Sequence, residues 1–193
     1  MINTLFFDCF GVLYVDVSHA YFSRFPEHHE ALYDLNKQAD HGFIDRTTYT
    51  QAVAKITGVS EEETARAFSR EHVINQPLID FIRGTLKSRY KIGLISNIGR
   101  GWIQDFFDEH QLHDLFEVVV MSSEEGITKP NPLIFERAAD RMSVSPDECL
   151  FIDDIQANCD GAKQAGMQAL LFTTNDQLRE ALKNTMLVKE EEK

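Results

Sequence analysis

The sequence has little positive charge. It contains 19 lysine and arginine residues against 31 aspartate and glutamate residues, which gives a net charge of −12 at pH 7. Proteins that bind nucleic acids or anionic membranes use basic surfaces to neutralise phosphates. We therefore expect neither as a partner. A small phosphorylated metabolite stays compatible with this charge, because it needs only a few local donors and a cation.

Cysteines and long apolar runs are also scarce. The three cysteines, Cys9, Cys149 and Cys159, form no CxxC pair and are odd in number, which favours reduced thiols. No apolar run approaches the roughly 20 residues of a membrane helix. Residues 1–8 carry an acid and no basic segment, unlike a signal peptide. We expect a cytoplasmic protein.

What the sequence does contain is typical of an α/β fold. Hydrophobic residues make up 43% of the chain, enough for a real core. Short apolar runs alternate with amphipathic stretches, as in a parallel sheet with crossover helices. The expected strands are residues 4–7, 92–95, 117–120, 149–152 and 169–172. Helices are expected from Pro77 to about Arg89 and after Pro132.

Residues 15–76 interrupt this alternation. Only helical patterns occur there: Tyr49, Val53 and Ile56 share a face, Gly58 can end that helix, and Asp45 can begin it. Ser60 with Glu63 predicts the start of another helix. The sequence predicts a Rossmann-like parallel-sheet core, residues 1–14 plus 77–193, with a small all-helical cap domain of residues 15–76.

Polar residues directly follow three of the expected strands. Asp8 follows the first, Ser96 and Asn97 the second, and Asp153 and Asp154 the fourth. Because the carboxyl ends of parallel strands line one crevice, these side chains are expected to meet. Carboxylates so close together need a cation, and hard oxygen ligands suit Mg2+.

Four segments resemble, in order, the motifs of the haloacid dehalogenase superfamily. They are an apolar strand with Asp8-Cys9-Phe10-Gly11, an apolar strand ending in Ser96-Asn97, Lys129 before Pro130-Asn131-Pro132, and an apolar strand with Asp153-Asp154 followed by Asn158. The resemblance covers nearly the whole chain. Singly each motif is weak, but the four together are specific.

The resemblance implies a role for each matching residue. Asp8 would be the nucleophile, and Lys129 would neutralise charge around it. Ser96 and Asn97 would bind the substrate. The metal ligands would be Asp8, the Phe10 backbone carbonyl and Asp154, with Asp153 and Asn158 supporting them.

Phe10 departs from the pattern of the superfamily's phosphatases, which carry Asp at this position as general acid. A phenyl ring transfers no proton, and such catalysis contributes about 10²–10⁴-fold. The resemblance therefore implies a magnesium-dependent hydrolase of small phosphate monoesters that acts through an aspartyl phosphate, with turnover slowed by Phe10.

Two alternatives stay open. The superfamily's haloacid dehalogenases also carry an aromatic residue at the position of Phe10, but they need no metal, so the Asp153–Asp154 pair favours phosphoryl chemistry. A phosphate-binding regulatory protein of low activity is the other alternative.

The expected cap suggests a small substrate for a monomer or small homo-oligomer. Candidate contacts in the cap, mostly expected to be ordinary surface residues, are His19, Arg24, His28, His29 and Arg46. Arg100 and Trp102 are candidates for the entrance.

Overall fold

A five-stranded parallel sheet forms the centre of the computed structural model, which describes residues 1–14, 21–70 and 73–191. The strand order is β3-β2-β1-β4-β5. The bounds are β1 Thr4–Phe7, β2 Lys91–Ser96, β3 Val118–Met121, β4 Cys149–Asp153 and β5 Gln168–Leu171. All five predicted strands are confirmed, with ends that differ by one residue at most.

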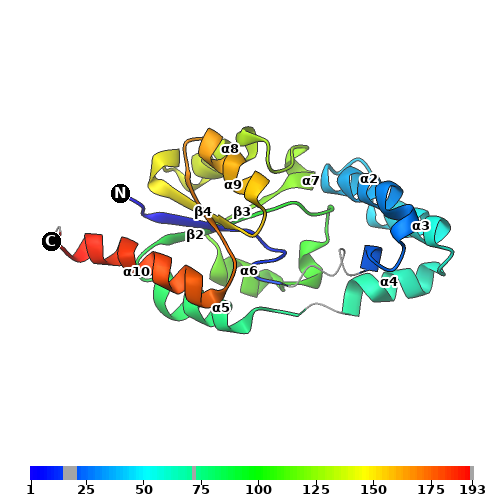
Figure 1. The fold of residues 1–193 in the computed structure, drawn as a ribbon, viewed down its shortest axis with the longest axis horizontal. Coiled ribbons are helices and arrows are strands. Elements are labelled where there is room, and N and C mark those ends of the chain that lie inside the picture. Colours follow the sequence, from blue (N-terminus) through cyan, green and yellow to red (C-terminus); the bar gives the residue numbers. More distant parts are fainter. Residues whose placement is uncertain (15–20, 71–72, 192–193) are drawn as a thin grey trace.

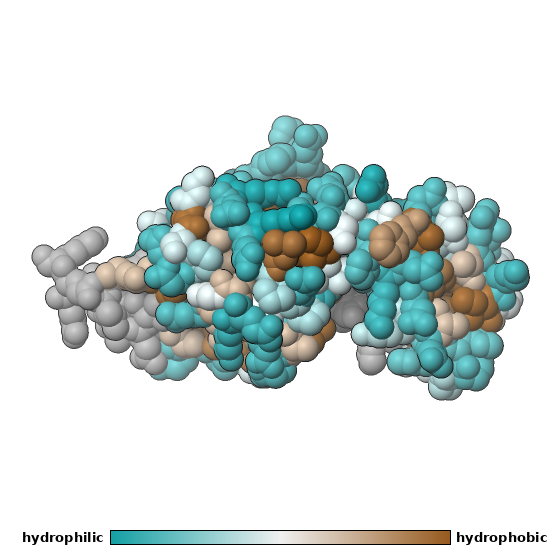
Figure 2. All heavy atoms as spheres, turned by 90° about the horizontal axis from the view of Figure 1, so that it is seen from above, coloured by the Kyte–Doolittle hydropathy of each residue, from teal (hydrophilic) through white to brown (hydrophobic). Residues whose placement is uncertain are grey.

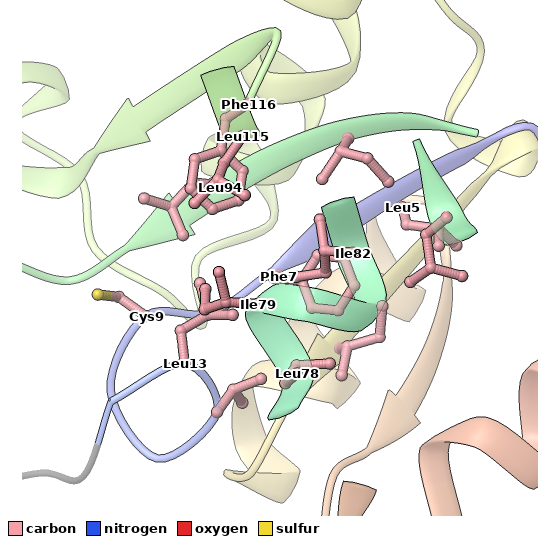
Figure 3. Close-up of a cluster of buried hydrophobic side chains, with 14 of the residues drawn as sticks. Leu5, Phe7, Cys9, Leu13, Leu78, Ile79, Ile82, Leu94, Leu115 and Phe116 are labelled. Atoms are coloured by element: carbon pink, nitrogen blue, oxygen red, sulfur yellow. The ribbon is translucent and has the colours of Figure 1, made fainter. Parts of the chain in front are cut away.

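Helices cover both faces of the sheet (Figure 1). One face carries α8 (Pro132–Met142) and α9 (Gln156–Gln164), which pack against Phe6. The other carries α5 (Gln76–Phe81), α6 (Glu109–Leu115) and α10 (Asn175–Glu191), which pack against Leu5 and Phe7. Alternate residues of β1 therefore supply two separate cores, as expected for a strand buried on both sides. The cluster around Leu5 and Phe7 is drawn in Figure 3.

The helix predicted from Pro77 to Arg89 is only partly right. The α-helix α5 ends at Phe81 and continues as one π-helical turn, η2 (Ile82–Leu86), in which the Lys87 amide donates to the Ile82 carbonyl at 3.0 Å. Gly84 lies in this turn and disfavours regular helix. Ile82 and Leu86 still reach the core.

A second group of helices lies beyond the carboxyl ends of the strands (Figure 1). This helical unit consists of α2 (His29–Asp40), α3 (Arg46–Thr57) and α4 (Glu61–Arg70). It has its own hydrophobic cluster, which includes Leu32, Tyr49 and Val53. Residues 15–20 and 71–72 of the expected cap lie outside the described residues.

The predicted ends of these helices are confirmed. The Asp45 side chain accepts a hydrogen bond from the Thr48 amide at 2.8 Å, and Gly58 ends α3 with a φ of 71°. Ser60 accepts from the Glu63 amide at 3.2 Å.

The minor helices complete the connections. They are η1 (Pro26–His28), η3 (Ile103–Asp105), α7 (Ser122–Glu125) and η4 (Pro146–Glu148). On the face shown in Figure 2, most residues are hydrophilic and the apolar ones form separate patches. Within the described residues we find no helix with the length and hydropathy that crossing a bilayer requires.

Candidate active site

The central strands bring the first and fourth motifs together. The chain fills the sheet from β1 outward to β3 and then returns to place β4 on the other side of β1. Such a reversal opens a crevice at the carboxyl ends of the two strands. The Asp8 amide donates to the Ile152 carbonyl at 2.9 Å, which holds Asp8 beside Asp153.

Lys129 links the two carboxylates. Its Nζ lies 2.6 Å from Asp8 Oδ1 and 2.7 Å from Asp153 Oδ2, and the residue is only 4% exposed. A buried ammonium is tolerated only when it is paired, so these two contacts fix the position of the lysine. The third and fourth motifs therefore meet at the first.

Asp153 is held by three further hydrogen bonds. Asn158 Nδ2 lies 3.1 Å from each carboxylate oxygen, and the Ile155 amide donates to Oδ1 at 2.8 Å. Asp153 is fully buried, whereas the adjacent Asp154 is exposed and lines the cavity described below. The two neighbouring carboxylates therefore lie in different surroundings.

Asn97 positions the loop that carries Lys129. Asn97 Oδ1 accepts from the Lys129 amide at 2.8 Å, and Asn97 Nδ2 donates to the Lys129 carbonyl at 3.0 Å. α9 packs closely against the same loop, because a Cβ at Gly161 would lie 2.1 Å from the Pro130 carbonyl oxygen. Asn97 also lines the cavity, so its predicted contact with substrate stays a prediction.

Ser96 ends β2 with an unused hydroxyl group. The residue is fully buried, and its Oγ has no hydrogen-bond partner among the described residues. A buried polar group without a partner costs about 1–3 kcal/mol. Ser96 is not among the residues that line the cavity described below, so its predicted contact with substrate stays a prediction.

Negative charge exceeds positive charge at this end of the sheet. Oxygens of Asp8, Asp153 and Asp154 lie within 4.8 Å of one another, and Lys129 is the ammonium paired with the first two. Burial, together with the charge of Asp153, raises the pKa of Asp8 well above its ordinary value, although Lys129 lowers it. Burial lowers the pKa of Lys129, but the two carboxylates outweigh this and the net pKa is raised.

Cys9 is an unsuitable nucleophile despite its place beside Asp8. Burial and the Asp8 charge raise the pKa of the Cys9 thiol well above its ordinary value, so the thiolate is disfavoured. All three cysteines are free thiols, as predicted, and all three are buried.

A cavity of about 380 Å³ lies between the strand ends and the helical unit. Asp8, Phe10, Lys129, Asp154 and Asn158 line its core side. The helical unit contributes Tyr33, Asn36, Asp40, Arg46, Tyr49, Thr50, Ala65 and Phe68.

Phe10 faces another aromatic ring in this cavity. Its ring packs edge-on against Phe106, with 4.8 Å between the centroids. The position that bears a carboxyl group in the superfamily's phosphatases is thus part of an apolar wall.

The candidate contacts outside the motifs have mixed outcomes. Arg46 and Trp102 line the cavity, whereas Arg24, His28 and His29 are not among its lining residues. Arg100 donates instead to the Ser123 carbonyl at 3.2 Å. His19 lies outside the described residues. Motif reasoning missed Asp40, Asp105 and Phe106, because only the tertiary fold brings them to the cavity.

Comparison with known proteins identifies the family. The model of haloacid dehalogenase-like hydrolases matches residues 2–166. The chain belongs to this family. It is a haloacid dehalogenase-like hydrolase with a site built from all four of the motifs that the sequence contains.

One curated relative of this haloacid dehalogenase-like hydrolase is a phosphatase from Mycobacterium tuberculosis. It is 41% identical over 71 residues, which are 37% of this chain and 33% of the relative. The match therefore spans about a third of that protein.

Two solved structures share the fold over most of their length. A HAD family enzyme from Bacteroides thetaiotaomicron, in complex with magnesium and inorganic phosphate, has a TM-score of 0.74 at 24% identity, over 91% of this chain and 96% of that chain. L-2-haloacid dehalogenase from Xanthobacter autotrophicus has a TM-score of 0.63 at 20% identity, over 95% and 83%. At these identities both comparisons concern the fold alone, so the choice between the two chemistries rests on the site.

Proposed function

We propose that this hydrolase cleaves small phosphate monoesters with Mg2+, through an aspartyl phosphate on Asp8. The observation that carries the proposal is the cluster of Asp8, Asp153 and Asp154 around Lys129. Attack on the carbon of a haloacid needs no metal, and surplus carboxylates would oppose the departure of a halide. Phosphoryl transfer uses a metal to offset such charge. The phosphatase relative agrees with this choice.

The residues present fit Mg2+. The donor set would be Asp8, the Phe10 backbone carbonyl and Asp154, all hard oxygen atoms, with water completing the shell. Burial raises the pKa of Asp8 most and the charge of Asp153 raises it further, and a cation held there would oppose both effects. Bound there, Mg2+ would shield the phosphoryl group and the attacking carboxylate from each other.

The proposed reaction has two steps. An Asp8 oxygen attacks phosphorus, the bond to the ester oxygen breaks, and its electron pair leaves with the alcohol, which takes a proton from water. Lys129 would bind phosphoryl oxygens, and so would the Ser96 hydroxyl, which has no partner among the described residues. Water then cleaves the acyl phosphate, which releases phosphate and restores Asp8. Asp153 and Asn158 would keep Lys129 in place.

The helical unit belongs, in this proposal, to a cap formed by residues 15–76. Two contacts support a closed position over the cavity. Arg46 at the start of α3 forms a two-pronged ion pair with Asp105, at 2.6 and 3.2 Å. Ser122 donates to the Asp40 carbonyl at 2.6 Å and accepts from the Ile98 amide at 3.0 Å. Closure of this kind excludes water from the reaction.

The two adjacent carboxylates are expected to respond differently to loss of charge. Asp154→Asn should raise the Mg2+ concentration for half-maximal activity by about tenfold or more, since it removes a charged ligand. Asp153→Asn should lower the thermal stability of the protein more than Asp154→Asn does, because it weakens a buried ion pair with Lys129. Magnesium titration and thermal unfolding of both variants test this. Full wild-type activity in excess chelator would contradict the proposal.

Gly11 keeps the space that the Asp154 carboxylate occupies. A Cβ at Gly11 would lie 2.2 Å from Asp154 Oδ2, and its φ is 84°. Gly101 is a matched control, since its φ is 74° and no atom lies within 4 Å of its Cβ position. Both alanine variants should lose about 1–2 kcal/mol of stability through backbone strain. Only Gly11→Ala should also weaken Mg2+ affinity, and equal affinity in the two variants would show that Gly11 has no such role.

Haloacid dehalogenation is the second candidate, favoured by one observation, the aromatic residue at position 10. It is tested by incubating the protein with chloropropionate in chelator and measuring chloride. A regulatory role is the third candidate, and its signature would be tight phosphate binding without turnover of any ester.

A further inference from the structure

Aromatic side chains form a large part of the apolar lining of the cavity. Six rings line the cavity, those of Phe10, Tyr33, Tyr49, Phe68, Trp102 and Phe106. Several are locked against one another: the Tyr49 and Trp102 centroids lie 4.8 Å apart, as do those of Phe10 and Phe106. Rigid aromatic walls favour a planar apolar group.

The charges along the cavity disfavour a second anion on the substrate. Among the described residues that line the cavity, Arg46 is the arginine and Lys129 is the lysine. Arg46 is neutralised by both oxygens of Asp105, and Lys129 by Asp8 and Asp153. A leaving group with its own carboxylate or phosphate would find no unpaired cation there.

Three polar side chains of the helical unit that line the cavity are hydrogen-bonded in a chain. The Tyr49 hydroxyl donates to Asn36 Oδ1 at 3.1 Å, and Asn36 Nδ2 donates to Asp40 Oδ2 at 3.2 Å. Because these groups already hydrogen-bond to one another, a sugar or other polyol would gain fewer hydrogen bonds from them than it loses to water.

We infer that the preferred substrate is the phosphate monoester of an aromatic alcohol that carries no second anionic group. This inference rests on the proposed function, since it assigns the alcohol whose ester oxygen is released when Asp8 takes the phosphoryl group. The inference agrees with the presence of Phe10. Because this residue donates no proton, the rate of phosphate release depends on the acidity of the leaving alcohol. The inferred preference is for binding of the aromatic ring in the cavity. It can be measured separately from the effect of leaving-group acidity.

The test uses alkyl esters, so that the acidities of the leaving alcohols stay close. Phenethyl phosphate, glycerol phosphate and phosphoglycolate are compared by kcat/KM with wild-type protein, and by calorimetric affinity with Asp8→Asn protein in Mg2+. Burial of a phenyl ring predicts phenethyl phosphate to be favoured by roughly 10- to 100-fold in both measurements. Equal or tighter binding of the other two esters would overturn the inference. If wild-type protein releases phosphate neither from these three esters nor from phenyl phosphate, the proposed function fails. The affinities measured with Asp8→Asn protein would still test whether the cavity prefers an aromatic group.

A pair of variants tests the role of the paired arginine. Asp105→Asn frees the Arg46 guanidinium, so affinity for phosphoglycolate should rise about tenfold or more. Arg46→Gln breaks the same ion pair without leaving a cation, so it should give no such gain. Any loss that both variants show with phenethyl phosphate reports loosening of the contact between the helical unit and the core. If Asp105→Asn gives no gain for phosphoglycolate, Arg46 does not face the leaving group and the charge-based part of the inference is wrong.

Discussion

Asp8→Asn is expected to lower phosphate release by at least about 10³-fold while the fold stays intact. The amide is almost the same size as the carboxylate, and its oxygen can still accept the hydrogen bond that the Cys9 amide gives at 2.7 Å. Lys129 keeps its contact with Asp153. The amide forms no acyl phosphate, so the chemical step is lost.

The measurement is phosphate release from phenyl phosphate, with thermal unfolding as the test of folding. Asp45→Asn is a matched control, because Asp45 caps α3 and Asn caps helices equally well. It should keep wild-type activity. If Asp8→Asn retains a large fraction of wild-type turnover in a sample free of host phosphatase, Asp8 is not the nucleophile.

Phe10→Asp is expected to raise turnover of alkyl phosphates by up to about 10²–10⁴-fold. In wild-type protein the departing alkoxide receives no proton from residue 10, so rates should rise steeply with leaving-group acidity. A carboxyl group at this position could protonate that oxygen and later activate water. The gain is smaller where loss of the contact with Phe106 misplaces the new carboxyl group.

Phe10→Asn separates proton transfer from packing. It makes nearly the same space as Phe10→Asp but supplies no acid, so it should give no gain. Single-turnover rates over esters of graded leaving-group acidity are the measurement. A flat dependence in wild-type protein, with brisk hydrolysis of alkyl esters, would mean that another residue gives the proton. Asp40 and Asp105 line the cavity and would be the first carboxyl groups to replace.

Much of the fold could be predicted because local patterns and the global structure agree. Apolar runs such as residues 149–152 read as strands, and each polar residue that follows one marks a strand end. Parallel pairing then brings Asp8 and Asp153 together without further information. The helix ends at Asp45 and Gly58 follow equally from local chemistry.

The rest depends on tertiary contacts that no local pattern encodes. The reciprocal bonds between Asn97 and the Lys129 backbone join residues 32 positions apart. The ion pair of Arg46 with Asp105 spans 59 positions and two structural units. Neither pair has a fixed spacing or motif, so these contacts could not be predicted from the sequence.

The covalent intermediate is the most direct test of this account. Wild-type protein with Mg2+ and phenyl phosphate is quenched in acid within one turnover and digested, and its peptides are analysed by mass spectrometry. We predict phosphate on the peptide that contains Asp8, absent in Asp8→Asn protein and in excess chelator. Because Phe10 supplies no base for the second step, this species should accumulate in the wild type. Phosphate release without any label on Asp8, or rapid chloride release from chloropropionate in chelator, would contradict the account.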